Sequence, residues 1–87
     1  MTEELLNHYF RALASKTRRD IISLLKDDCL CAGDIGKYFN LTGATISHHL
    51  KILSESKLIK RKRMGLSIYY SLNITEWNFI KNWFNCI

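Results

Sequence analysis

The spacing of apolar residues predicts two helices in the first third of the chain. Three apolar side chains lie three or four positions apart within residues 3–13, which places them on one helical face. They are Leu6, Phe10 and Leu13. A second stripe follows Ser15, whose hydroxyl suits the cap of a helix N-terminus. It comprises Ile21, Leu24 and Leu25. We expect this second helix to end near residues 27–28.

The middle of the chain predicts two helices joined by a turn. Residues 34–39 form the first expected helix, residues 40–43 the turn, and residues 44–55 the second helix. In the second helix the apolar side chains share one narrow arc, while small, polar and cationic side chains lie on the opposite side. Two helices with such a turn between them make a candidate helix-turn-helix. A short strand at residues 29–31 precedes it.

The pattern changes from helical to alternating at Ile59. Alternation predicts a strand that ends at a turn over residues 64–65, and residues 66–72 are rich in strand-forming side chains. We expect a hairpin here, followed by a last helix over residues 75–86 with its first residue as the cap. The predicted fold is mainly α with a small β-hairpin, a winged helix-turn-helix, in a single domain over residues 1–87.

The positive charge of the chain is concentrated in its second half. The formal net charge is +5, and basic and acidic side chains cancel over residues 1–42. Residues 43–87 hold seven basic side chains against two acidic ones, so the whole surplus lies there, much of it in the unbroken basic run 60–63. Such a surplus suits a polyanion such as nucleic acid. An edge strand whose charge prevents aggregation is the alternative interpretation.

The expected helix over residues 44–55 has the surface chemistry of a helix that enters the major groove of DNA. Its outer side carries no acidic side chain before Glu55, and hydroxyl, imidazole and ammonium groups there can bond to bases and phosphates. An ordinary solvated face is the alternative. The candidate DNA-binding residues of the turn and helix are Thr42, Gly43, Ala44, Thr45, Ser47, His48 and Lys51. The hairpin adds Arg61, Lys62 and Arg63.

The last expected helix is too apolar to be covered by one small core. Apolar side chains extend over more than half of its circumference, and both tryptophans of the chain lie in it. A symmetric partner is the simplest cover, so we expect a homodimer. A thicker single core reached by the first helix is the alternative. The candidate interface residues of this helix are Trp77, Ile80, Trp83 and Phe84.

Several segments occur in an order and at a spacing that resemble those of a known family. They are residues 12–22, residues 32–35, the run Ile46-Ser47-His48-His49-Leu50-Lys51-Ile52-Leu53, the pair Leu58-Ile59, and Gly65 with Tyr69-Tyr70-Ser71-Leu72. They resemble the ArsR/SmtB family of winged helix-turn-helix repressors over residues 8–72, most closely its small Sdp-type autorepressors. The resemblance implies a sequence-specific repressor of double-stranded DNA that acts as a homodimer on a two-fold symmetric operator. It also implies that the helices over 3–13 and 75–86 form the dimer, which adds Leu6, Tyr9 and Phe10 to the interface.

Two lysines depart from the pattern of that family. Lys16 replaces the usual proline, and Lys57 replaces the usual glycine after the second helix of the helix-turn-helix. We therefore expect a strained left-handed backbone at Lys57. Arg18 and Arg19 stand in the first turn of their helix, where cations oppose the helix dipole. A phosphate or an ion pair must compensate, and we favour an ion pair for Arg18.

The cysteines raise the question of a metal or redox sensor. Cys29 and Cys31 can bind a soft metal or be oxidised, so a metal- or redox-responsive repressor is an alternative function. The arsenic-type site of the family falls on Cys31 and Gly33, and the zinc-type site falls on Ile74 and Glu76, so neither set is complete. We expect reduced thiols, no metal and no cofactor.

The remaining expectations concern function class and partners. No phosphate loop, paired carboxylates or nucleophile with a base occurs, so we expect no enzyme. No apolar run is long enough to span a membrane, and the N-terminus has no signal-type stretch, so we expect a cytoplasmic protein. The expected partners are double-stranded DNA and a second copy of the chain, with a protein anti-repressor as a further candidate. A winged-helix module that binds acidic proteins is the other alternative function.

Overall fold

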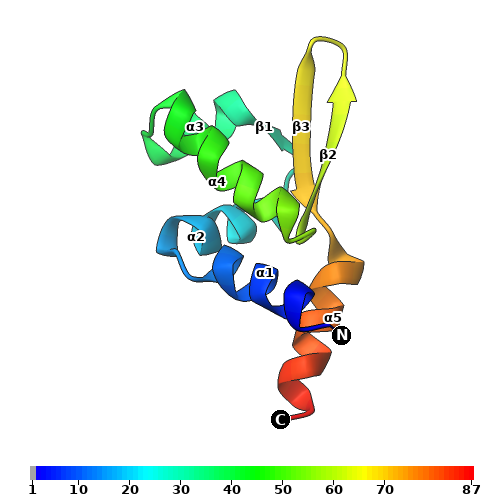
Figure 1. The fold of residues 1–87 in the computed structure, drawn as a ribbon. Helices are drawn as coiled ribbons and strands as arrows, with labels where there is room; N and C mark the ends of the chain where they lie inside the picture. Colours follow the sequence, from blue (N-terminus) through cyan, green and yellow to red (C-terminus); the bar gives the residue numbers. More distant parts are fainter. Residues whose placement is uncertain (1) are drawn as a thin grey trace.

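The computed structural model describes residues 2–87, and within them the elements follow the predicted order. The helices are α1 (Glu3–Leu13), α2 (Lys16–Leu25), α3 (Ala32–Phe39), α4 (Gly43–Glu55) and α5 (Ile74–Asn85). The strands are β1 (Leu30–Cys31), β2 (Ile59–Met64) and β3 (Ser67–Leu72). The winged helix-turn-helix prediction is confirmed: α3 and α4 form the helix-turn-helix, and β2 and β3 form the wing (Figure 1).

Side-chain caps explain where most of the helices begin. The oxygens of Thr2, Ser15 and Thr42 accept hydrogen bonds from backbone N–H groups three residues later, so α1, α2 and α4 begin just after them. The predicted cap of α5 was wrong by two residues. The side chain of Asn73 accepts from the N–H of Glu76, and the N–H of Asn73 donates to the carbonyl of Leu58 at 2.9 Å, which fixes the start of α5 beside the wing.

The sheet is antiparallel in the order β1-β3-β2, with the wing hairpin in register from Ile59 opposite Leu72 to Met64 opposite Ser67. The turn lies one residue later than predicted, because Met64 still pairs within the ladder. Gly65 has a φ of +64° there, a conformation that glycine adopts without strain. The short β1 pairs Leu30 with Tyr70 of β3, which holds the start of α3 against the sheet.

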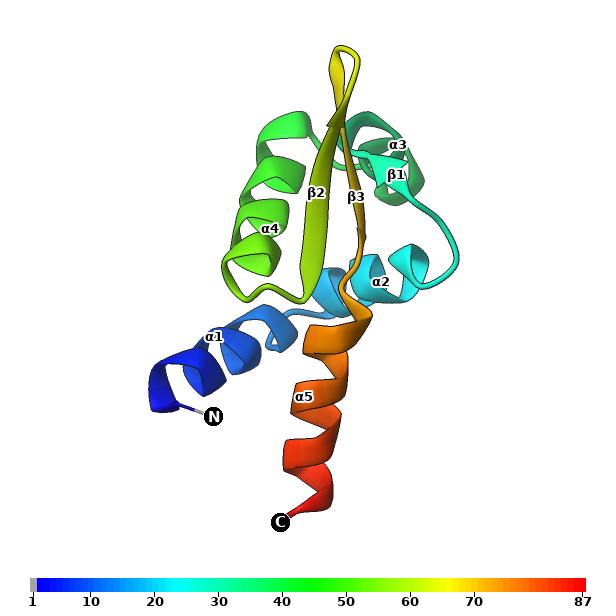
Figure 2. The same ribbon diagram turned by 90° about the vertical axis from the view of Figure 1, so that its right-hand side faces the viewer.

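The hydrophobic core lies where α1, α2, α3 and α4 meet the sheet. Its buried side chains come from every helix and from the base of the wing: Tyr9, Ala12, Ile21, Ile22, Leu25, Ile35, Ile46, Leu50, Ile52, Leu53, Leu58, Ile59, Tyr70 and Ile80. Only the start and middle of α5 contribute to it. The rest of α5 extends away from the body, at the end of the molecule opposite the wing tip (Figures 1 and 2). No helix in residues 2–87 has the length and apolar character needed to cross a membrane.

The residues that follow α4 form a tight buried corner. Ser56 is fully buried, and its hydroxyl donates to the carbonyl of Leu53 at 2.6 Å and accepts from the N–H of Leu58 at 3.2 Å. Lys57 has a φ of +64°, so the expected left-handed backbone is confirmed. This corner turns the chain from α4 into β2 and thereby sets the position of the wing beside α4 (Figure 2).

Candidate nucleic-acid interface

Helix α4 has one buried and one exposed side. Ile46, Leu50 and Leu53 are at most 2% exposed and pack into the core. Thr45, Ser47 and His48 are exposed, and so is Lys51 one turn further on. The helix therefore presents hydroxyl, imidazole and ammonium groups to solvent along one side, because the apolar arc predicted from the sequence holds the other side in the core.

The N-terminus of α4 is open. The hydroxyl of Thr42 accepts from the N–H of Thr45 at 3.3 Å and lies 2.9 Å from the hydroxyl of Thr45. A Cβ added at Gly43 would meet nothing within 4 Å. The first N–H groups of a helix have no partner within the helix and carry its positive dipole end. This end of α4 therefore suits an approaching phosphate.

The wing carries exposed cations. In β2 only Ile59 is buried, and the basic run after it is exposed throughout. The one ion pair found in residues 2–87 joins Lys16 to Asp20 on α2, so Arg61, Lys62 and Arg63 are not neutralised by carboxylates of the described chain. At the wing tip Arg63 Nε donates to the carbonyl of Gly65 at 3.4 Å.

A groove of about 530 Å³ lies between α4 and the wing. Ser47 and Lys51 of α4 line it on one side, and Arg61 lines it from β2. The carboxylate of Glu55 stands at the C-terminal end of α4, where the acid-free stretch ends. Residues far apart in the sequence thus share one concavity, which holds two cations and one carboxylate.

A second hollow, of about 360 Å³, lies between α3 and α4 and adds residues that the sequence-based prediction missed. Lys37 and Asn40 line it together with Ser47, and its walls include Gly33 and Gly36. The signal for Lys37 was present in the sequence as a cation near the end of the first helix of the helix-turn-helix. The prediction covered only the turn and second helix of that motif, so it did not include Lys37.

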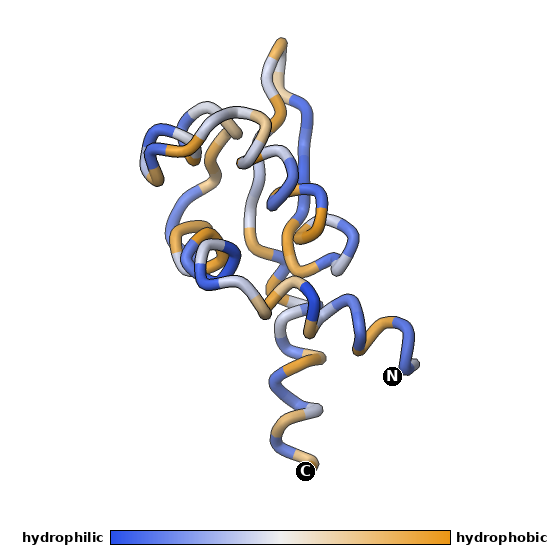
Figure 3. The backbone as a smooth tube through the Cα atoms, turned by 60° about the vertical axis from the view of Figure 1, so that its left-hand side comes forward, coloured by the Kyte–Doolittle hydropathy of each residue, from blue (hydrophilic) through white to orange (hydrophobic). Residues whose placement is uncertain are grey.

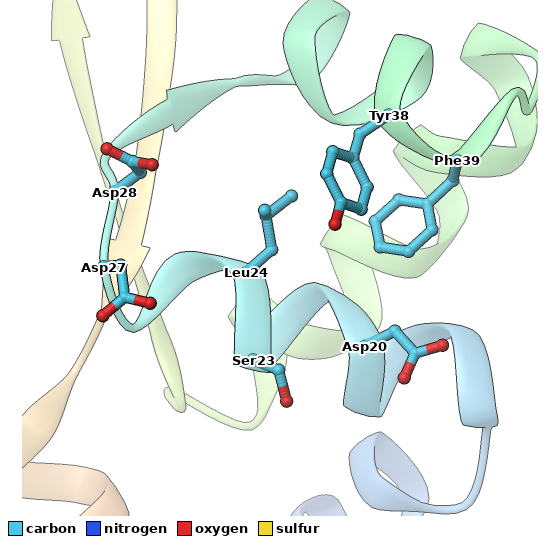
Figure 4. Close-up of a pocket in the computed structure, with 7 residues that line it drawn as sticks. All are labelled: Asp20, Ser23, Leu24, Asp27, Asp28, Tyr38 and Phe39. Atoms are coloured by element: carbon cyan, nitrogen blue, oxygen red, sulfur yellow. The ribbon is translucent and has the colours of Figure 1, made fainter.

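A third hollow, of about 400 Å³, differs in charge from the other two (Figure 4). It lies between α2 and α3, and its acidic side chains are Asp20, Asp27 and Asp28. The rings of Tyr38 and Phe39 face Leu24 across it. Three carboxylates repel phosphate, so this hollow lies outside the candidate nucleic-acid interface.

The predicted ion pair of Arg18 is wrong. Its guanidinium donates to the carbonyls of Arg11 at 2.7 Å and Ala12 at 3.0 Å, at the C-terminal end of α1. Arg19 donates to the carbonyl of Leu13 at 2.6 Å. The cost of two cations at the start of α2 is therefore offset by the negative end of the neighbouring helix.

Arg18 also reaches α4. Its Nη1 lies 3.3 Å from Nδ1 of His49, a half-buried residue next to His48 on α4. Burial lowers the pKa of His49 below its usual value, and electrostatic interactions with Arg18 and His48 lower that pKa further. These effects favour the neutral imidazole of His49 at the edge of the exposed side of α4.

The cysteines are free thiols. Cys29 and Cys86 are exposed and Cys31 is half-buried. Cys31 is the N-cap residue of α3, and its Sγ lies 3.1 Å from a carboxylate oxygen of Asp34. Across residues 2–87 no three His, Cys, Asp or Glu side chains gather closely enough to hold a metal ion.

Aromatic side chains of α1 and α5 form an exposed cluster. Phe10 meets Trp83 edge to face with 5.5 Å between ring centroids, and Trp83 meets Phe84 at 5.2 Å. Phe10 is 41% exposed and Phe84 is 50% exposed. Part of the cluster therefore remains in water when the chain is alone.

Two of the residues predicted to lie on the dimer surface are instead buried within the chain. Tyr9 is 0% exposed and Ile80 is 1% exposed, and both belong to the hydrophobic core. The hydroxyl of Tyr9 donates to a carboxylate oxygen of Glu76. Burial raises the pKa of Tyr9, and the hydrogen bond and negative charge of Glu76 raise it further. Neither Tyr9 nor Ile80 retains surface for a partner.

Comparison with known proteins shows the family. Residues 15–61 match the model of a bacterial regulatory protein of the arsR family. The chain is 45% identical over 78 residues to the transcriptional repressor SdpR of Bacillus subtilis (strain 168), which covers 90% of this chain and 87% of that protein. The resemblance found in the sequence is thereby confirmed.

Solved structures show the same fold. An ArsR-like transcriptional regulator from Rhodococcus sp. RHA1 matches with a TM-score of 0.88 at 24% identity, over 98% of this chain and 81% of that one. The homodimeric winged helix-turn-helix DNA-binding domain of a possible ArsR-family regulator from Mycobacterium bovis matches with a TM-score of 0.75 at 25% identity, over 79% of this chain and 64% of that one. The chain therefore belongs to the arsR family of bacterial regulatory proteins, and it is a transcriptional regulator with a winged helix-turn-helix DNA-binding domain.

Proposed function

We propose that this protein is a transcriptional repressor that binds double-stranded DNA sequence-specifically, as a homodimer on a two-fold symmetric operator. The observation that supports the proposal is the groove between α4 and the wing, which Ser47, Lys51 and Arg61 line together. An exposed helix side without acids and an unneutralised basic strand lie on either side of it. Such a surface is complementary to a major groove and its flanking phosphates.

The residues divide into two roles. Thr45, Ser47 and His48 carry short donors and acceptors that suit base edges, so they supply sequence preference. The remaining residues contact phosphates through cationic side chains or through the open start of α4: Thr42, Gly43, Ala44, Lys51, Arg61, Lys62 and Arg63. These contacts set the position and affinity of the protein on DNA.

The exposed aromatic cluster supports the homodimer. A second copy would cover the surface that Phe10 and Phe84 expose, which a single chain leaves in water. The similar domain from Mycobacterium bovis is homodimeric, which adds support. The proposed interface is formed by Leu6, Phe10, Trp77, Trp83 and Phe84. A two-fold dimer would place its α4 helices on half-sites about 10 base pairs, or a multiple of that, apart.

Similarity to the transcriptional repressor SdpR supports repression as the outcome of binding. A dimer on its operator would exclude polymerase from the same DNA. We place the protein in the cytoplasm, where it meets its operator, and a protein anti-repressor is the proposed means of relief.

Selection of bound sequences from a random duplex library with the purified protein tests the function. The expected result is a two-fold symmetric consensus, and binding to it should weaken steeply as salt rises. Ser47→Ala with His48→Ala should reduce the preference for the consensus over random duplex by at least about tenfold. Absence of any duplex binding at low salt would reject the proposal in favour of a protein-binding module.

The matched control replaces a charged residue that lies far from the proposed DNA-binding surface. Lys81→Ala on α5 removes one exposed cation without touching α4 or the wing, so it should leave the consensus and its affinity nearly unchanged. A consensus without two-fold symmetry would contradict the dimeric part of the proposal while leaving DNA binding itself in place.

A further inference from the structure

The side chain of Arg18 joins three helices. It belongs to α2, it donates to two carbonyls at the C-terminal end of α1, and it reaches His49 of α4. Arg19, the next residue, also donates to an α1 carbonyl but makes no bond to α4. Arg18 thus provides a side-chain link between α1, which belongs to the proposed dimer surface, and α4, which belongs to the proposed DNA surface.

The chemistry of the link specifies the state of His49. A guanidinium only donates hydrogen bonds, so Nδ1 of His49 must accept, and the ring proton must reside on Nε2. A protonated imidazole has no acceptor nitrogen and would face the positive charge of Arg18. The link therefore exists only with a neutral His49.

The charged groups around His49 all favour that neutral state. Arg18 of α2 and His48 of α4 act on it directly, and Arg11 of α1 acts on Arg18. Each of these groups carries a positive charge when it is charged. If His49 is protonated, the hydrogen bond to Arg18 is lost, and none of these groups can replace it with a favourable ionic contact.

We propose that Arg18 is a positioning residue for DNA binding, because it ties neutral His49 on α4 to the C-terminal carbonyls of α1. The inference rests on the proposed function, since it assigns to α4 the role of the DNA-binding helix. Neither Arg18 nor His49 belongs to the residues proposed to touch DNA. Their effect on affinity acts through the orientation of α4, which carries Ser47 and His48 on its exposed side.

The test compares Arg18→Leu with Arg19→Leu. Both variants remove one positive charge and hydrogen bonds to carbonyls at the end of α1, two with Arg18 and one with Arg19, but only Arg18→Leu removes the link to α4. With the duplex selected by the wild-type protein, Arg18→Leu should bind at least about tenfold more weakly than Arg19→Leu, as expected for the loss of hydrogen bonds to a charged group. Equal affinities for the two variants would overturn the inference.

Arg18→Lys serves as a second variant if Arg18→Leu does not fold. It keeps the charge, but an ammonium is a compact donor that cannot span two carbonyls and the ring nitrogen. Circular dichroism establishes which variant is folded before binding is measured. A folded Arg18→Lys protein with wild-type affinity would also overturn the inference.

Rescue and spectroscopy separate positioning from a merely structural role. The wild-type affinity for DNA should fall between pH 7.5 and 5.5, because protonation of His49 breaks its link to Arg18. His49→Asn places a carbonyl oxygen near the position of Nδ1 and does not titrate, so it should bind within about threefold of wild type at pH 7.5 and should not show that fall. His49→Leu should behave like Arg18→Leu. If His49→Asn retains the wild-type drop, the link is not the cause of it.

Nitrogen NMR of the DNA-free protein tests the link independently of DNA binding. The spectrum should show the proton of His49 on Nε2, and this signature should change in Arg18→Leu but not in Arg19→Leu. A proton on Nδ1 would overturn the inference whatever the DNA result. Failure of the wild type to bind any duplex would instead reject the proposed function, and with it the role of the link in DNA binding.

Discussion

Lys57 occupies a backbone conformation that costs most residues free energy. Its φ of +64° lies in the left-handed region, where a side chain brings Cβ too close to the following carbonyl oxygen at a cost of about 1–2 kcal/mol. The corner persists because the side chain of Ser56 is fully buried and bonds to the backbone on both sides of the corner, at Leu53 and at Leu58. The position of the wing beside α4 is thus obtained at the expense of local strain.

Lys57→Gly should therefore raise the free energy of unfolding. Removing the Cβ relieves the strain, while the greater freedom of glycine in the unfolded chain offsets part of the gain, so we expect a net increase of about 0.5–1 kcal/mol. Urea denaturation followed by circular dichroism measures it. The control Lys60→Gly, at an exposed position inside β2, should lower stability instead. A decrease with Lys57→Gly would contradict the strain argument.

His49 should make the stability of the fold depend on pH. Its pKa in the folded chain is lowered by burial first and by Arg18 second, so unfolding allows it to bind a proton more readily. The stabilisation from neutral His49 is present above about pH 6.5, its usual pKa, and is lost as the pH falls below that value. The midpoint of urea unfolding should fall between pH 7.5 and 5.5, and His49→Asn should reduce that fall. An unchanged fall would assign the effect to other groups.

At the level of elements, the wing divides its cations between two faces. Successive side chains of a strand point to opposite faces, so Arg61 and Arg63 share one face and Lys60 and Lys62 share the other. Arg61 lines the groove next to α4, so the face that it shares with Arg63 borders the proposed DNA surface of that helix. The buried corner at Ser56 and Lys57 connects α4 to the wing and so helps to place the two side by side.

Replacing Arg61 by Ala should remove one phosphate interaction per subunit. The slope of log affinity against log salt should become shallower by about 0.9 for each phosphate that the protein no longer neutralises, and binding to all duplexes should weaken alike. Fluorescence anisotropy at several salt concentrations measures both quantities. Lys81→Ala on α5 should leave the slope unchanged. A loss of sequence preference without a change of slope would instead assign Arg61 to base recognition.

For the whole molecule, the distribution of surface determines what can assemble. The molecule is elongated, 40 × 23 × 21 Å, with the wing tip at one end and α5 at the other (Figure 1). Coloured by the hydropathy of each residue, the chain shows apolar positions that continue along α5 beyond the body (Figure 3). The proposed dimer surface is thus remote from the wing tip, so a second copy on α5 need not obstruct the wing of either chain.

Phe84→Glu should weaken the proposed dimer. Phe84 is 50% exposed, and a two-fold interface would lose its burial twice, so we expect at least about 30-fold weaker self-association. Sedimentation equilibrium gives the association constant. Leu66→Glu, the same kind of change at the 98% exposed wing tip, should leave association unchanged. If Phe84→Glu associates as the wild type does, the aromatic cluster is not the interface.

The sequence by itself determined what depends on neighbours along the chain. Apolar spacing predicted the two-sided α4, and alternation predicted the wing. These features follow from helix and strand periodicity. They could be predicted because no distant contact is needed to produce them.

Only the tertiary structure decided which residues far apart in the sequence meet. Tyr9 and Ile80 had the same apolar signal as Phe10 and Phe84, but the packing of the helices buries the first pair in the core and leaves the second exposed. The partners of Arg18, two carbonyls and a histidine, carry no charge pattern that a sequence search for ion pairs would find. The burial of an apolar side chain and the partner of a cation depend on how the helices pack, which local periodicity does not specify.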